Sequence, residues 1–411
     1  MSSRAFDFSS LFPDSLPAPA TKWTGGARYN FTGGNNEPGM VPVDALREAA
    51  DKVLVREGRA LSNYTVNTGP QGYLPLREFI AQKLKHGAEI SCSADDIVMV
   101  SGSLQALDLV NAALCERGDT VIYEEDCYQG SINRMVRMGV NVAGIPLDKG
   151  GMRMDALANA LAQMKSRGVR PKFIYTIPTV QNPTATILSE ERRVEMLRLA
   201  DEYNVPIFED DCYADLIWSG ERPPALYAMS QRENVIYIGS FSKPIAPALR
   251  VGYIVAPWQV LSRVLALKTD AGSGALEQMV LAEFCKPHFA SHVPQLRAAL
   301  RAKLVTLQES LNEQFGTAAE FDDAPGGIFL WIKLPDQVDS MQLYQKALAA
   351  GVAINPGAEW SVNASHSRSR IRLCFASLSH QDIRDGVAIL AEVCRKEFGV
   401  PARSANVQKQ S

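Results

Sequence analysis

The chain has 411 residues, of which 46% are hydrophobic and 21% are charged, and this length favours one large domain plus a smaller one over a single small core. Lysine and arginine number 42, and aspartate and glutamate number 45, so the formal net charge is −3. This balance argues against a nucleic-acid partner.

The seven cysteines are scattered and form no C-x-x-C pair, and the five histidines show no metal-ligand spacing. We therefore expect reduced cysteines, no metal site and a cytoplasmic location. The first 20 residues contain acids and prolines and lack the apolar core of a secretory signal. No apolar run is long enough to span a bilayer, so no membrane association is expected.

Taken in order, the chain opens with a serine- and proline-rich arm up to about residue 24, and a turn-rich loop, FTGGNNEPGMVP, follows at 31–42. Periodic apolar positions then predict helices over 43–56, 76–85, 104–116 and 188–203, and strands over 97–100, 120–123, 141–145, 173–177 and 206–208. Short apolar strands separated by helical patterns indicate a mainly parallel sheet covered by helices on both faces.

The remaining chain carries two more strands, a long helical region and a second α+β region. We expect strands over 235–238 and 251–255, helical structure up to about 315, and then the elements 327–333, 340–350, 370–375 and 380–397. The predicted organisation is α/β. A large domain covers 46–285, a small α+β domain covers 286–411, and residues 1–45 form an arm and part of the small domain.

Lys243 lies between two predicted strands, in the stretch YIGSFSKPIAPALRVGYIV. Ser240 and Ser242 precede it, and Arg250 follows it. Pro244 keeps the next residues out of a regular ladder because proline lacks the N–H group. A lysine can form a Schiff base with an aldehyde, while hydroxyls and a guanidinium suit a phosphate. The alternative for an isolated S-x-K is a surface lysine on a loop.

Ser103 and Leu104 lie where strand 97–100 turns into the predicted helix 104–116. Exposed backbone N–H groups and the helix dipole at such a start favour a phosphate dianion. Ser103 adds a hydroxyl, whereas Leu104 offers only its backbone N–H. The alternative is an ordinary serine at a helix N-terminus.

Polar residues also follow three other predicted strands, and the carboxyl ends of parallel strands border the ligand crevice of such sheets. Glu209, Asp210 and Asp211 follow strand 206–208, Asn182 follows strand 173–177, and Tyr128 follows strand 120–123. A buried carboxylate can hold a protonated pyridine nitrogen, an amide can donate to a phenolate oxygen, and a tyrosine ring can stack on a cofactor. Helix capping, an Asn-Pro turn and core packing are the respective alternatives.

In this order, the motifs resemble those of fold-type I pyridoxal 5′-phosphate (PLP) enzymes of the class I/II aminotransferases. The resemblance is greatest to the branch of 2-aminoadipate, kynurenine and aromatic aminotransferases, which also supplies the effector domain of MocR-type regulators, and it covers residues 31–375. It implies that Lys243 carries PLP and that, by the D-x-x-Y spacing, Asp210 and Tyr213 act on the pyridine nitrogen and the phenolate oxygen. It assigns further cofactor contacts to Ser103, Leu104, Tyr128, Asn182, Ser240, Ser242 and Arg250.

The same resemblance implies a substrate site and a shared interface. Arg372, on strand 370–375, would clamp the substrate carboxylate, because a guanidinium matches a carboxylate bidentately; Arg370 has the same parity on that strand. Gly34 and Asn182 would border the substrate, and Tyr64 would reach the cofactor phosphate of a second subunit in a homodimer. The sequence departs from the family where Leu104 replaces a polar residue, Ala185 a glycine and Asn36 a proline.

The predicted function is transfer of an amino group from an L-amino acid to a 2-oxo acid by a ping-pong mechanism. The alternatives are other PLP reactions at Cα (β-lyase, racemase, cyclase or oxidase), a PLP-sensing regulator and an inactive scaffold. We expect no regulator, because only about 30 residues precede the matching region, too few for a winged helix. The side-chain preference stays open, with Trp23, Arg28 and Trp360 as candidates to border the pocket.

Overall fold

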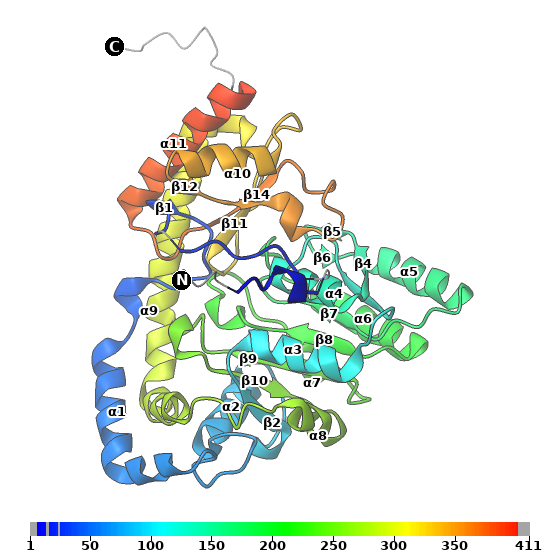
Figure 1. Cartoon of the computed structure of the whole chain (residues 1–411), viewed down its shortest axis with the longest axis vertical. Coiled ribbons are helices and arrows are strands. Elements are labelled where there is room, and N and C mark those ends of the chain that lie inside the picture. Colours follow the sequence, from blue (N-terminus) through cyan, green and yellow to red (C-terminus); the bar gives the residue numbers. More distant parts are fainter. Residues whose placement is uncertain (1–5, 14–15, 24, 402–411) are drawn as a thin grey trace.

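The computed structural model describes residues 6–13, 16–23 and 25–401, and its centre is a seven-stranded sheet in the order β2-β10-β9-β8-β7-β3-β4 (Figure 1). Only β10 runs antiparallel to its neighbours, which confirms the expected mainly parallel α/β architecture. The strands are β2 (Ile97–Val100), β3 (Thr120–Glu124), β4 (Asn141–Ile145), β7 (Ile174–Thr176), β8 (Ile207–Asp210), β9 (Val235–Ser240) and β10 (Gly252–Val255).

Helices cover both faces of this sheet because its strands are apolar on both sides. On β2, Val98 and Val100 pack with α3, α4 and α8, whereas Ile97 and Met99 pack on the opposite face with α2 and α9. The helices are α1 (Val43–Glu57), α2 (Leu74–Gly87), α3 (Ser103–Leu114), α4 (Gln129–Met138), α5 (Met154–Ser166), α6 (Glu190–Tyr203), α7 (Leu226–Met229), α8 (Trp258–Leu267) and α9 (Ala275–Phe315).

The long helix α9 runs beside the large sheet and continues into a second, smaller unit (Figure 1). That unit contains the three-stranded antiparallel sheet β11-β14-β13. Its elements are β11 (Phe329–Lys333), α10 (Ser340–Ala349), β12 (Val352–Ala353), β13 (Asn355–Pro356), β14 (Arg370–Cys374) and α11 (His380–Phe398). A short hairpin, β5 (Leu147–Asp148) with β6 (Gly151–Met152), lies in the larger unit.

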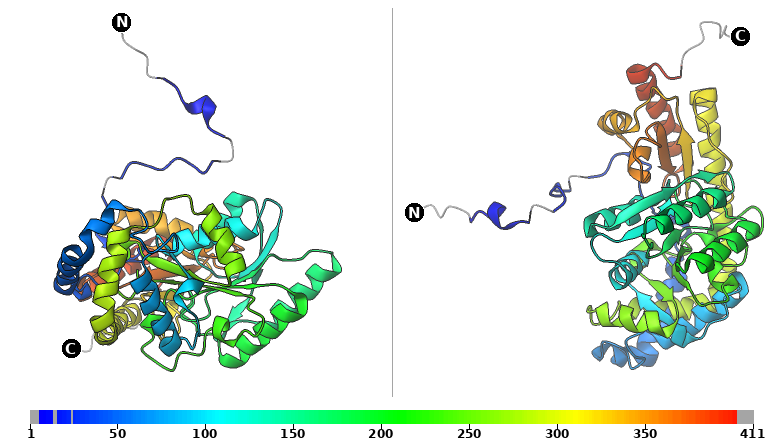
Figure 2. Two further views of the ribbon diagram at one scale, coloured as in Figure 1. Left: turned by 90° about the horizontal axis from the view of Figure 1, so that it is seen from below. Right: turned by 90° about the vertical axis from the view of Figure 1, so that its right-hand side faces the viewer.

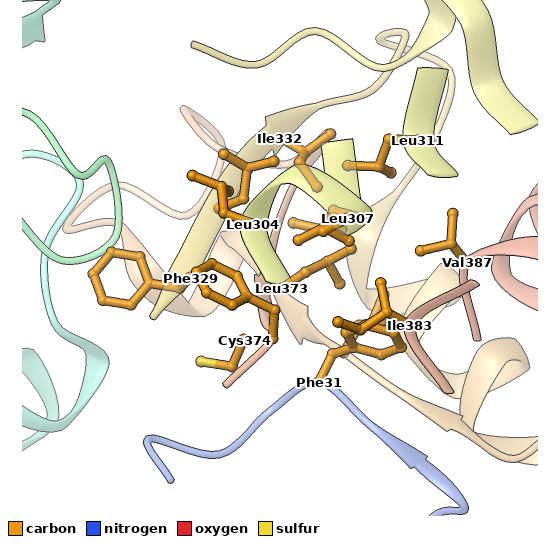
Figure 3. Close-up of a cluster of buried hydrophobic side chains, with 14 of the residues drawn as sticks. Phe31, Leu304, Leu307, Leu311, Phe329, Ile332, Leu373, Cys374, Ile383 and Val387 are labelled. Carbon is orange, nitrogen blue, oxygen red and sulfur yellow. The ribbon is translucent and has the colours of Figure 1, made fainter. Parts of the chain in front are cut away.

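The segment before α1 is anchored in the smaller unit. Its strand β1 (Tyr29–Asn30) pairs in parallel with β12. The next residue, Phe31, is fully buried against Ile383 and Val387 of α11, in a core that also contains Leu307 of α9 (Figure 3). This anchoring carries residues 32–37 back toward the large sheet.

The described parts of the N-terminal arm extend away from the rest of the chain (Figure 2). They expose large apolar side chains, such as Phe6, Phe12 and Trp23. Along the described ranges, no helix combines the length and apolarity needed to cross a bilayer.

Candidate active site

A cavity of about 310 Å³ lies where the large sheet meets the smaller unit. Its volume is at the lower end of the range for small-molecule sites, roughly 300–1,000 Å³. Most of the residues singled out from the sequence line it, namely Gly34, Ser103, Leu104, Tyr128, Asn182, Asp210, Tyr213, Ser242, Lys243, Arg250 and Arg372. The lining also includes Thr32, Gln129, Ile177, Cys212, Pro247, Asn355 and Trp360.

Lys243 sits in the turn after β9, where Pro244 prevents the strand from continuing. Its Nζ donates a 2.6 Å hydrogen bond to the carbonyl oxygen of Gly34, and it lies 5.6 Å from the centre of the Tyr213 ring. Burial lowers the pKa of the Lys243 amine, because desolvation disfavours the ammonium form. A lysine with a lowered pKa is the form suited to nucleophilic attack on a carbonyl carbon.

The start of α3, at Ser103 and Leu104, is a corner suited to an anion, because the first N–H groups of a helix have no partners within it. Arg250 is held over this corner by a 3.0 Å hydrogen bond from its guanidinium to the carbonyl of Ser101. Gly252 is required here, since a Cβ on it would approach the Ser103 nitrogen to 2.9 Å. The corner therefore combines a cation, hydroxyls and free donors.

Ser242 adds its side chain to the same cavity, while Ser240 lies behind it. The two hydroxyls are 2.9 Å apart, and Ser240 Oγ also accepts from the backbone N–H of Ser242 at 3.1 Å. Ser240 therefore orients Ser242 and does not itself line the cavity.

Asp210, at the end of β8, is the acid of its triplet that lines the cavity. Its Oδ2 accepts a 2.7 Å hydrogen bond from the hydroxyl of Tyr175 on β7. Burial raises the pKa of the Asp210 carboxyl, and a cation placed against it would lower that pKa again. Glu209 points to the other face, where it accepts from the N–H groups of Leu226 and Tyr227 at 3.0 and 2.9 Å.

Asn182 is buried in the cavity wall, and its Oδ1 has no hydrogen-bond partner among the described residues. The preceding residue, Gln181, donates to Glu124 Oε2 at 2.9 Å, and Thr176 donates to Glu124 Oε1 at 2.7 Å. Burial raises the pKa of Glu124 to about 7. This network fixes the loop that carries Asn182.

Arg372, on β14, is sandwiched between two aromatic rings. Its guanidinium carbon lies 4.5 Å from the centre of Phe329 and 4.3 Å from that of Trp360. The side chain is buried, and its Nε has no acceptor among the described residues. A buried guanidinium with a free donor is suited to a carboxylate ligand. Arg370 instead lines a separate cavity of about 490 Å³.

The remaining candidates divide between the cavity and the surface. Tyr128 lines the cavity with its ring centre 5.8 Å from that of Trp360. Tyr64 lines another cavity and is 82% exposed. Trp23 is 86% exposed, and Arg28 is also exposed and stacks on Tyr29.

Comparison with known proteins identifies the family. Residues 28–390 match the family model for aminotransferase class I and II. The chain is 30% identical to aromatic-amino-acid aminotransferase 1 of Thermococcus litoralis over 90% of this chain and 88% of that protein. It is 36% identical to the uncharacterised HTH-type transcriptional regulator YdfD of Bacillus subtilis over 77% of this chain, but that match spans only 65% of the regulator.

The fold is likewise similar to that of solved aminotransferases. LysN, the α-aminoadipate aminotransferase of Thermus thermophilus, solved in complex with N-(5′-phosphopyridoxyl)-L-leucine, superposes with a TM-score of 0.85 and 28% identity over 95% of this chain and 99% of that one. The chain therefore belongs to the aminotransferase class I and II family of fold-type I, PLP-dependent enzymes.

Proposed function

We propose that this cavity binds PLP and an amino acid together, and that the enzyme transfers the amino group of an L-amino acid to a 2-oxo acid by a ping-pong mechanism. The observation that carries the proposal is the convergence of Lys243, Asp210 and Arg372 on one cavity. Asp210 ends β8, Lys243 lies in the turn after β9, and Arg372 is the middle residue of β14 in the smaller unit. A reactive amine, a buried acid and a buried guanidinium are what an amine-transfer site requires.

The lining of the cavity fits the polar groups of PLP. The corner of Ser103, Ser242 and Arg250 suits the phosphate dianion. The buried carboxyl of Asp210 suits a protonated ring nitrogen, and Oδ1 of Asn182, which has no hydrogen-bond partner among the described residues, supports a polar neighbour in the cavity wall. We propose that Tyr128 stacks on the face of the PLP ring. Tyr213 and Asn182 would contact its phenolate oxygen.

When bound, PLP supplies an electron sink that makes the Cα–H bond of an attached amino acid acidic and accepts its amino group. The protein contributes position and proton transfer. Arg372 binds the substrate carboxylate, which fixes Cα relative to Lys243. The Lys243 amine would take up the Cα proton and then donate it to the cofactor carbon that bears the amino nitrogen, a role for which its lowered pKa is suited. The carboxylate of Asp210 stays paired with positive charge and so supports the electron sink.

We further propose a cytoplasmic homodimer in which Tyr64 serves the partner subunit. Its 82% exposure and its separation from the Lys243 cavity support this assignment. In the proposed organisation, residues 46–285 bind the cofactor, and residues 286–411 with the N-terminal segment form the smaller domain.

A half-reaction tests the proposal. Adding a single amino acid without any 2-oxo acid should remove the visible absorbance of the lysine-bound cofactor and leave pyridoxamine phosphate on the enzyme. Adding a 2-oxo acid should restore the absorbance. A panel of amino acids, beginning with acidic and aromatic members, would also reveal the substrate preference. Multiple turnovers with one amino acid and no pyridoxamine form would instead show another reaction. Ammonia release would indicate a lyase, oxygen uptake an oxidase, and loss of optical activity without either a racemase.

A further inference from the structure

Three consecutive carbonyl groups in the Lys243 turn are held by side chains from distant parts of the chain. Asn36 Nδ2 donates to the Lys243 carbonyl at 2.9 Å and to the Ile245 carbonyl at 3.1 Å. Between them, the Pro244 carbonyl lies 2.9 Å from Nε2 of His292 on α9. Buried carbonyls need hydrogen-bond partners, so these two side chains help to fix the turn, together with backbone bonds such as that from Ile245 N–H to the Phe241 carbonyl at 3.0 Å.

Asn36 is itself held firmly. Its side chain is only 6% exposed, and its Oδ1 accepts from the backbone N–H of Glu37 at 2.8 Å. The Glu37 carboxylate forms an ion pair with Lys303 of α9, and Lys303 also donates to the Ala376 carbonyl at 2.8 Å. The Asn36 amide is therefore linked, through Glu37 and Lys303, to helix α9 and to the smaller unit.

The same loop also contacts the other end of Lys243. The carbonyl of Gly34 accepts the hydrogen bond from Nζ at 2.6 Å, and a Cβ on Gly34 would lie 2.7 Å from Nζ. This loop thus binds the backbone of Lys243 through Asn36 and its amine through Gly34. A shift of either group displaces the amine within the cavity.

We infer that Asn36 is a positioning residue for Lys243, with His292 in a supporting role: by fixing the carbonyls of the turn, Asn36 sets the place of the Lys243 amine in the cavity. The inference rests on the proposed function, in which Lys243 is the reactive amine. Asn36 contacts the backbone of the turn, and it acts through Lys243.

Loss of the Asn36 amide should move the amine and change its titration. Burial lowers the pKa of the free Lys243 amine, and water admitted by a displaced turn would likewise change the titration of the Lys243 nitrogen when it is bonded to the cofactor, which the visible absorption band reports. The other titratable or charged groups around the amine are unaltered by this change; they are Asp210, Cys212, Tyr213, Arg250, Arg372 and Cys374.

The experiment compares the holoenzymes of wild type, Asn36→Ala and the matched control Asn35→Ala, whose side chain is exposed. Three quantities are measured: kcat and KM for an amino acid, the pH midpoint of the visible absorption band, and the thermal unfolding midpoint. For Asn36→Ala we expect kcat to fall by about tenfold or more, because a misplacement near 1 Å costs on the order of a hundredfold. The pH midpoint should shift, KM should change little, and Asn35→Ala should match wild type.

His292→Leu gives a second test if Asn36→Ala does not fold, because it removes the hydrogen bond to the Pro244 carbonyl and leaves both Asn36 contacts in place. It should shift kcat and the pH midpoint in the same direction by a smaller amount. Folded variants that unfold at a lower temperature but keep the wild-type kcat and pH midpoint would show a merely structural role and overturn the inference.

Borohydride reduction and peptide mapping of the wild type separate the two levels of the proposal. A label on another lysine would contradict the proposed function itself. A label on Lys243, together with Asn36 variants whose kcat and pH midpoint match wild type, would contradict only the positioning role of Asn36.

Discussion

The hydroxyl of Tyr175 donates a 2.7 Å hydrogen bond to Oδ2 of Asp210 across the neighbouring strands β7 and β8. Both side chains are buried. The ring of Tyr123 on β3 stacks on Tyr175 at 4.6 Å between centres, which limits its movement. The carboxyl group therefore has a fixed orientation at the floor of the cavity before any ligand binds.

We expect Asp210→Asn to lower kcat by several orders of magnitude, because a neutral amide cannot balance the positive charge of a protonated ring nitrogen as a carboxylate does. Tyr175→Phe should lower kcat by about tenfold, since a hydrogen bond to a charged group contributes roughly 1.5–3 kcal/mol. Steady-state kinetics measure both effects.

Tyr123→Phe is the matched control for Tyr175→Phe. The Tyr123 hydroxyl is buried without a hydrogen-bond partner among the described residues, so its removal should leave kcat unchanged and stability unchanged or slightly higher. Asp210→Asn activity within about threefold of wild type, or ~0.7 kcal/mol of barrier, would contradict the assignment.

Arg372→Lys tests whether the substrate carboxylate requires a planar guanidinium. The stacking of Arg372 between Phe329 and Trp360 suits a flat group, and lysine cannot form the bidentate pair. We expect the KM for an amino acid to rise by about tenfold or more, as a charge-assisted hydrogen bond is lost. Arg370→Lys, on the same strand but at another cavity, should leave KM near the wild-type value. Equal effects of the two changes would argue against the assignment.

Several residues of the site could be predicted because polar residues at the carboxyl ends of parallel strands border the ligand crevice. Asp210 and Asn182 could be predicted because each follows an apolar run at a carboxyl end of the sheet. Glu124 ends β3 in the same way. The same rule could therefore have predicted Glu124, the residue that holds the Gln181 loop. The sequence does not show the role of Glu124, because its partners Thr176 and Gln181 are more than 50 residues away along the chain.

Other features had no local signal. Asn36 and Lys243 are 207 residues apart, and a side chain that binds distant carbonyls leaves no periodic pattern. The strand pair β1 and β12 consists of two residues on each side, too short for alternation to be read. Helix α4 is not among the predicted elements, because its first turn, Gln129, Gly130 and Ser131, contains no apolar residue and no side-chain cap.

The pH dependence of stability should reveal the buried carboxyl of Glu124. Its pKa is about 7 in the folded protein against 4.5 for the ordinary group, so the folded state binds the proton more tightly. The contribution of Glu124 to the free energy of unfolding is therefore constant below about pH 4.5. It falls as the pH rises from about 4.5 to about 7, and it is constant again above that. The loss amounts to roughly 3 kcal/mol, at about 1.4 kcal/mol per pH unit.

Glu124→Gln should flatten this part of the curve, since the substituted amide does not titrate. The measurement is the difference in unfolding free energy between variant and wild type, taken from denaturant titrations between pH 4.5 and 8. Glu125→Gln, at the next position along the chain, serves as the control for a generic change of charge. A difference between wild type and Glu124→Gln that does not vary with pH would contradict the raised pKa.

The exposed position of Tyr64 gives a test of the proposed dimer. If Tyr64 completes the cavity of the partner subunit, Lys243→Ala and Tyr64→Ala each weaken every site in their own homodimers. A hybrid dimer then holds one intact site, with Lys243 from one chain and Tyr64 from the other. Equal mixing should restore up to about a quarter of the wild-type activity, because half of the dimers are hybrids and half of their sites are intact.

Mixing Lys243→Ala with Asp210→Asn is the control and should restore nothing, since both residues belong to the cavity of one chain. A fully active monomer in sedimentation, or equal results from the two mixtures, would place Tyr64 outside the partner's site.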